Sequence, residues 1–151
     1  MDEQLKAIFV RLRTTADFAD TDFSDVNATI SDGDNALHCV VRWGDLEAAK
    51  ALIDAGADMN KAGDLGYTPL HVACMKGNAE MVKLLIGRGA DIFALSDGDA
   101  PLATARLGGH DAICEILAPL MQEAQKHSPK AWVRARIAQL QREISSLEKK
   151  L

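Results

Sequence analysis

The residues with the most obvious capacity for chemistry are four histidines, three cysteines and many aspartates. The histidines form no HExxH motif, and no Cys/His spacing suits zinc. Asp32–Asp34 and Asp97–Asp99 bring carboxylates together, but both segments lack the spacing and final glutamate of a calcium-binding loop. No glycine-rich phosphate motif precedes a predicted helix. We therefore expect no enzymatic activity, no catalytic residue, no metal and no cofactor.

The cysteines Cys39, Cys74 and Cys114 are odd in number and have no CxxC spacing. Each lies among apolar neighbours in a helical pattern, which is typical of reduced core residues. Free thiols are common in reducing compartments, so we expect a cytoplasmic protein. No apolar run is long enough for a transmembrane helix. The N-terminal residues also lack the features of a secretory signal.

The elements that position these residues are indicated by an internal repeat of 33 residues. A shift of that length superimposes several segments, and a third copy follows after a single deletion. The first copies of the repeated pieces are Gly33–His38, Gly44 and Gly56–Asp58; the second are Gly66–His71, Gly77 and Gly89–Asp91; the third are Gly98–Leu102 and Gly109.

Local signals within this repeat predict two short helices per unit. Thr68 can cap a helix N-terminus, and Pro69 suits the first helical position. Gly77 permits a tight reversal, and Gly89 ends the second helix in the left-handed region. An extended connection then leads to the next unit.

The quoted motifs resemble those of the ankyrin family, whose unit contains G-x-T-P-L-H near its start and G-A-D-x-N near its end. Residues 66–94 match nearly throughout, whereas residues 33–61 have Asn35-Ala36 in place of Thr-Pro. Residues 98–117 match more loosely, with Ala103 where histidine is usual. The resemblance covers roughly residues 20–118 and implies an all-α ankyrin-repeat solenoid. It also implies that His38 and His71 form hydrogen bonds across the turn segments.

The charge distribution and the repeats together divide the chain. Residues 1–125 carry 10 basic against 20 acidic side chains, whereas residues 126–151 carry 7 against 2. We expect an N-terminal capping half-repeat at residues 1–31, ankyrin repeats at 32–127 and a C-terminal amphipathic helix at 128–151. Ser128-Pro129 is a good start signal for this helix.

The C-terminal helix has apolar residues at spacings of three and four, which form a heptad seam. Because a helix of this length is marginal alone, we favour one folded back over the last repeat. A homodimer through the seam and a free helix that binds a partner are the alternatives. The short basic segment lacks interleaved aromatics, so we expect no nucleic-acid or membrane partner. The seam consists of Val133, Ile137, Leu140, Ile144, Leu147 and Leu151.

The ankyrin resemblance implies a concave partner-binding face formed by the turn tips and the first helix of each unit. Trp43 and Tyr67 are the expected anchors, because aromatic residues are enriched at interfaces. Alternatively, Trp43 packs against the neighbouring repeat and the turn aspartates cap helices or lie in solvent. The predicted partner-binding residues are Asp32, Asp34, Arg42, Trp43, Asp64, Leu65, Tyr67, Met75, Lys76, Asp97, Asp99 and Leu107. An acidic rim that includes Asp17, Asp20, Asp22 and Asp25 suits a partner with a basic, locally apolar surface.

The sequence therefore predicts a non-catalytic module that binds another protein, as an adaptor or an inhibitor. One specific alternative is an immunity-type protein that neutralises a toxin or enzyme. The other is a structural homodimer assembled through the C-terminal helix.

Overall fold

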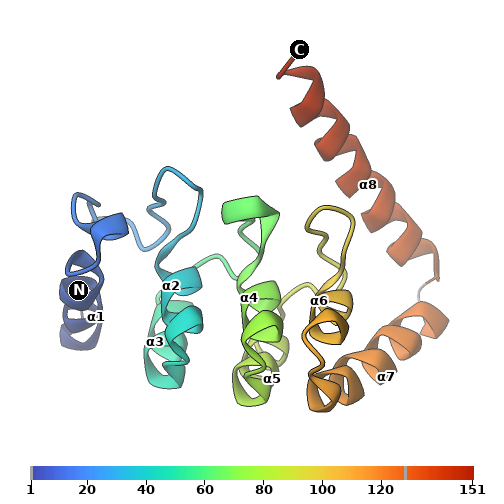
Figure 1. Cartoon of the computed structure of the whole chain (residues 1–151), viewed down its shortest axis with the longest axis horizontal. Coiled ribbons are helices and arrows are strands. Elements are labelled where there is room, and N and C mark those ends of the chain that lie inside the picture. Colours follow the sequence, from blue (N-terminus) through green and yellow to red (C-terminus); the bar gives the residue numbers. More distant parts are fainter. Residues whose placement is uncertain (1, 128) are drawn as a thin grey trace.

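The computed structural model describes residues 2–127 and 129–151, with side chains at all of these except residues 129–132 and 135. Six helices form three pairs that stand side by side in a row, with α1 at one end and α8 leaving the other (Figure 1). The predicted all-α solenoid is confirmed. The helices of the described chain are α1 (Glu3–Arg13), α2 (Ala36–Trp43), α3 (Leu46–Asp54), α4 (Pro69–Lys76), α5 (Ala79–Gly87), α6 (Pro101–Leu107), α7 (Asp111–His127) and α8 (Pro129–Glu148).

Long connections project from the same end of the helix pairs (Figure 1). We call them the first finger (residues 19–35), the second finger (residues 55–68) and the third finger (residues 88–100). An isolated β-bridge pairs Thr29 with Asn35 in the first finger, and another pairs Ser96 with Asp99 in the third finger. The second finger contains a short 3₁₀ turn, η2 (Asp64–Gly66), and another such turn, η1 (Ala16–Phe18), precedes the first finger.

The central pair shows how local sequence sets the helix ends. The Thr68 hydroxyl accepts a hydrogen bond from the His71 backbone N–H, and Pro69 occupies the first helical position. Gly77 follows α4 with φ of 71°, and Gly89 follows the end of α5 with φ of 95°. A residue with a Cβ atom is strained at such angles, so glycine ends each helix cleanly. The predicted capping and turn positions of this unit are confirmed.

The core runs along the row of helix pairs. Helix α4 packs against both α2 and α6, and its inner side chains, including Leu70, Ala73 and Cys74, are almost completely buried. Leu52 and Leu85 fill the equivalent position in α3 and α5. Burying a leucine stabilises a fold by about 1.5–3 kcal/mol, so these repeated layers hold the stack together.

The N-terminal end of the row is closed by aromatic residues. The Phe9 and Phe23 rings stack with their centroids 4.5 Å apart, and Phe18 lies 5.9 Å from Phe23. Leu12 is completely buried beneath them. One helix and these three rings thus cover the apolar flank of the first pair. A boundary at residue 31 stays a prediction.

Helix α8 diverges from the row (Figure 1). Its N-terminal segment contacts α7, and Gln139 Nε2 donates a hydrogen bond to the Leu95 carbonyl at 3.1 Å. The seam residues remain exposed, from 38% at Leu140 upwards. The favoured prediction that the seam folds back over the last repeat is therefore wrong, because polar side chains face the stack instead. Ser128, the predicted cap, lies outside the described residues.

Cys39, Cys74 and Cys114 are free thiols, and the first two are buried. This confirms two of them as core residues, while Cys114 is only partly covered. Over the part of the chain that the structure describes, no helix is long and apolar enough to cross a membrane.

Candidate protein-binding surface

The fingers are held in place by buried histidines. His38 Nδ1 accepts a hydrogen bond from the Asn35 backbone N–H at 3.1 Å, and its Nε2 reaches the Tyr67 carbonyl of the second finger at 2.9 Å. His71 repeats the arrangement one unit later, with Thr68 and the Asp99 carbonyl of the third finger. The predicted cross-turn role of both histidines is confirmed. Each histidine thus fixes the finger that follows its own helix pair.

The pKa values of both imidazoles follow from this position. Burial lowers the pKa of His38, and the nearby Asp34 carboxylate and the Tyr67 carbonyl only partly offset it. Burial likewise lowers the pKa of His71 against the opposing effect of the Asp99 carbonyl. The neutral imidazole is therefore the form that the fold stabilises.

A buried carboxylate, Asp34, joins the first and second fingers. Asp34 Oδ2 accepts a hydrogen bond from Arg42 Nη2 at 2.9 Å, and its Oδ1 accepts one from the Asp64 backbone N–H at 2.8 Å. Burial alone would raise the pKa of Asp34, but these two donors and the neighbouring charges outweigh it and lower the pKa. A methyl group on Gly63 would overlap this carboxylate and come within 2.8 Å of His38 Nε2. Glycine is required there for space.

Next to this carboxylate lies a groove of about 240 Å³ between the second finger and helices α2 and α4. We call it the central groove. Its apolar side is formed by Leu65, Tyr67, Val72 and Met75, and its polar side by charged residues of both signs. The lining residues are Asp34, Arg42, Asp64, Leu65, Tyr67, Val72, Met75 and Lys76.

Leu65 is the most unusual residue of the groove. Its side chain is 74% exposed, and its backbone has φ of 55°, in the left-handed region. In the third finger Asp97 adopts the same conformation with φ of 50°. Aspartate visits this region more readily than leucine, because its short polar side chain can bond locally. The Leu65 backbone has a structural role, because its carbonyl accepts a hydrogen bond from Ser96 Oγ of the third finger at 2.7 Å. Its exposed side chain, by contrast, buries little surface, and residues in sparsely populated conformations are concentrated at functional positions.

The structure brings most of the predicted partner-binding residues together in the central groove. Val72 is the one groove residue that is missing from the predicted partner-binding residues, and it is 3% exposed. It forms the floor of the groove. A signal was present, since Val72 lies three residues before Met75 and so on the same side of the helix.

Trp43 does not line the central groove. It is half-buried against the core, and the Arg11 guanidinium lies 4.1 Å from the centre of its ring. Arg11 Nη1 also pairs with Asp45 Oδ2 at 2.6 Å, so the ring of this last residue of α2 is held against α1. These contacts correspond to the alternative interpretation of Trp43 as a packing residue. A role as a partner anchor stays a prediction.

The remaining predicted residues flank the groove. Leu107 ends α6 with 82% exposure. Asp32 and Asp99 are exposed on the first and third fingers. Asp97 lines a different cleft, which separates the third finger from α8. The proposed rim residues Asp17, Asp20, Asp22 and Asp25 are also exposed.

A family model for ankyrin repeats in three copies matches residues 12–96 and 61–130, which together span most of the chain. The repeated helix pairs, the fingers and the histidine bonds between them agree with that match. The chain belongs to the ankyrin-repeat family. Ankyrin repeats are generally protein–protein interaction modules and typically non-catalytic. A search of curated proteins gives no match. Within the described part of this ankyrin-repeat protein, no group of three or more histidine, cysteine or acidic residues is placed to hold a metal ion.

Proposed function

We propose that this ankyrin-repeat protein binds a protein partner through the central groove, as an adaptor or an inhibitor. An apolar side chain of the partner sits against Leu65, Tyr67 and Met75. Basic residues of the partner face the exposed aspartates of the fingers. The observation that carries the proposal is the exposed, left-handed Leu65 at the edge of the groove.

The chemistry of the groove supports a protein ligand. Tyr67 is half-buried, and Met75 is 42% exposed, so both offer apolar surface without further rearrangement. Aromatic residues and methionine are enriched at protein interfaces, where a few anchors dominate the binding energy. The Asp34–Arg42 ion pair on the polar side of the groove is already formed without a partner. Binding to a prepared surface avoids part of the entropic cost of ordering it.

The charge around the groove supports a basic partner. Residues 1–125 carry 10 basic and 20 acidic side chains, and aspartates are exposed on all three fingers. Such a surface raises the rate of encounter with a basic protein and disfavours acidic ones. Binding is therefore expected to weaken as salt is added, because the exposed charges are screened.

The test compares Leu65→Asp with Val10→Asp in affinity capture from native lysate, quantified by mass spectrometry. Asp97 already occupies the equivalent backbone conformation, so Leu65→Asp should fold normally. Val10 is 64% exposed on α1, which makes it a matched control outside the groove. We expect Leu65→Asp to reduce capture of the partner at least about tenfold, equivalent to roughly 1.4 kcal/mol, while Val10→Asp retains it. Equal capture by both variants would contradict the proposal.

Once the partner is captured, experiments with it distinguish an inhibitor from an adaptor. An inhibitor forms a one-to-one complex that abolishes an activity of the partner. An adaptor binds this partner and a second protein at once. Light scattering of the purified complex, together with an activity assay of the partner, distinguishes these outcomes.

A further inference from the structure

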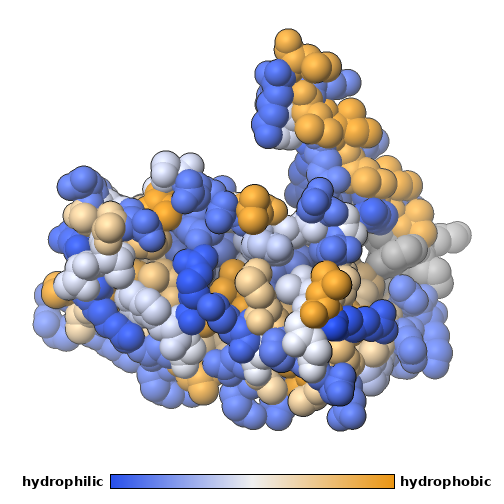
Figure 2. All heavy atoms as spheres, in the orientation of Figure 1, coloured by the Kyte–Doolittle hydropathy of each residue, from blue (hydrophilic) through white to orange (hydrophobic). Residues whose placement is uncertain are grey.

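Most of the apolar seam of α8 faces away from the rest of the protein, although Leu147 also borders the cleft beside the fingers. Figure 2 shows an apolar stripe along this helix, on the side turned away from the fingers. Its residues Val133, Ile137, Ile144 and Leu147 are 45%, 48%, 54% and 62% exposed. Soluble proteins rarely leave a continuous apolar strip uncovered, so this one indicates an interaction site.

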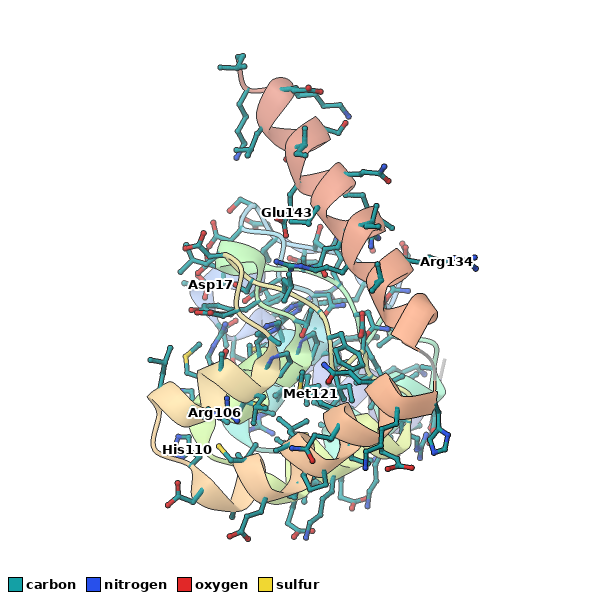
Figure 3. The ribbon with its side chains drawn as sticks, turned by 90° about the vertical axis from the view of Figure 1, so that its right-hand side faces the viewer. Asp17, Arg106, His110, Met121, Arg134 and Glu143 are labelled. Atoms are coloured by element: carbon teal, nitrogen blue, oxygen red, sulfur yellow. The ribbon has the colours of Figure 1, made fainter. Side chains whose placement is uncertain are left out.

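Several polar residues of α8 face the fingers. Gln139, Arg142, Glu143 and Ser146 line the cleft between α8 and the fingers, at the spacing of one helix face. Figure 3 shows Glu143 on the side toward the fingers and Arg134 pointing away. With 100° per residue, this polar face and the seam lie roughly a third of a turn apart. Rotation of α8 in place would therefore be needed for the repeats to cover the seam.

The identity and order of the seam residues favour a second copy of the same helix. The spacings place Ile137, Ile144 and Leu151 at heptad position a, and Val133, Leu140 and Leu147 at position d, so the four central residues combine isoleucine at a with leucine at d. β-Branched residues at a with leucine at d favour parallel, two-stranded coiled coils. In that arrangement each isoleucine meets its own counterpart, and each leucine does the same. We propose that two copies of this chain associate through a parallel coiled coil of their α8 helices.

The area of the seam sets the strength of this dimer. Burying a whole aliphatic side chain removes roughly 60–120 Å² from water. With the exposed fractions of the six seam residues, two copies would remove roughly 400–850 Å² of apolar surface. A standard stable interface buries about 1,200–2,000 Å². The dimer is therefore weak and depends on protein concentration.

Charges beside the seam allow an experiment to distinguish parallel from antiparallel helices, although in the wild type they oppose the parallel arrangement that the seam residues favour. In a parallel pair, Glu143 at position g approaches Glu148 at position e of the second copy, and the two repel. In an antiparallel pair that aligns all six seam residues, Glu148 instead approaches Arg134 and attracts it. Reversing the charge at position 148 therefore has opposite effects in the two arrangements.

The test is sedimentation equilibrium of the full chain from about 10 μM to 1 mM. The wild type should approach twice the monomer mass as concentration rises. Ile144→Lys should weaken association at least about tenfold, whereas Ser145→Lys, which adds the same charge one residue off the seam, should not. Unchanged circular dichroism of both variants would show that the helices are intact. A wild type that stays monomeric at 1 mM, or equal effects of the two lysines, would overturn the proposal.

Glu148→Lys completes the experiment. A parallel dimer should tighten several-fold, because the new lysine faces Glu143 of the second copy. Weaker association on this change would overturn the parallel arrangement. Leu65→Asp should leave the dimer unchanged, so this test stands apart from that of the central groove.

Discussion

His71 provides the sharpest test of how the stack is held together. Replacing His71 with leucine retains a side chain of similar size but removes both ring nitrogens. The backbone N–H of Thr68, which donates to Nδ1 at 3.2 Å, then has no acceptor in a buried setting. The Asp99 carbonyl loses its 2.9 Å contact with Nε2.

The two losses differ in size. A buried donor left unpaired costs about 1–3 kcal/mol. Asp99 lies on an exposed finger, so water can replace Nε2, and only the net value of a hydrogen bond, about 0.5–1.5 kcal/mol, is lost. We expect His71→Leu to lower the free energy of unfolding by about 2–4 kcal/mol. For a chain of this length, that corresponds to a fall in Tm of roughly 4–16 °C.

Urea unfolding followed by circular dichroism measures this change, with the slope compared between variants to confirm that cooperativity is kept. His127→Leu is the matched control. The His127 side chain is 76% exposed and pairs with Glu123 on the same helix. A surface pair of this kind contributes at most about 1 kcal/mol. A free energy of unfolding for His71→Leu within about 0.5 kcal/mol of that control would refute the reasoning.

Two further predictions concern acid and thiol chemistry. Burial lowers the pKa of His38 and His71 below the ordinary value of about 6.5. Below that pH the unfolded chain binds more protons than the folded one, so the free energy of unfolding falls as the pH drops. Melting temperatures should therefore decline between pH 7.5 and 5, and they should decline less steeply in His71→Leu. Burial also raises the pKa of Cys39 to about 11 and of Cys74 to about 12. At pH 8 a thiol-specific reagent should therefore label the partly exposed Cys114 first, with all three labelled in denaturant; rapid labelling of Cys74 in the native protein would contradict its place in the core.

Sequence reasoning succeeded where structure depends on neighbouring residues. The ends of α4 follow from Thr68, Pro69 and Gly77, which act through bonds and angles within one turn of the helix. The histidine links could be predicted as well, because the family motif places the imidazole at a fixed distance from the following finger. Most of the groove residues were named for the same reason.

Sequence reasoning failed where geometry depends on distant parts of the chain. Trp43 lies beside the groove residue Arg42 in sequence, yet Arg11 of α1 determines its surroundings. The position of α8 likewise involves a contact with a distant segment, the hydrogen bond from Gln139 to the Leu95 carbonyl, which its own amphipathic pattern does not predict. The heptad spacing predicts which apolar residues share one face of α8 but carries no information on which way that face points.

Each buried histidine bonds to a carbonyl of the finger that follows its own helix pair, so these links have a direction along the stack. Loss of the C-terminal pair with its finger would leave the imidazole of His71 without the Asp99 carbonyl, whereas loss of the N-terminal unit would leave the Asp58 backbone N–H without Asn27. Fraying from the two ends therefore breaks different hydrogen bonds. Ala103 stands in α6 at the position equivalent to His71, where no such link is needed, because α7 is followed by α8 instead of another finger.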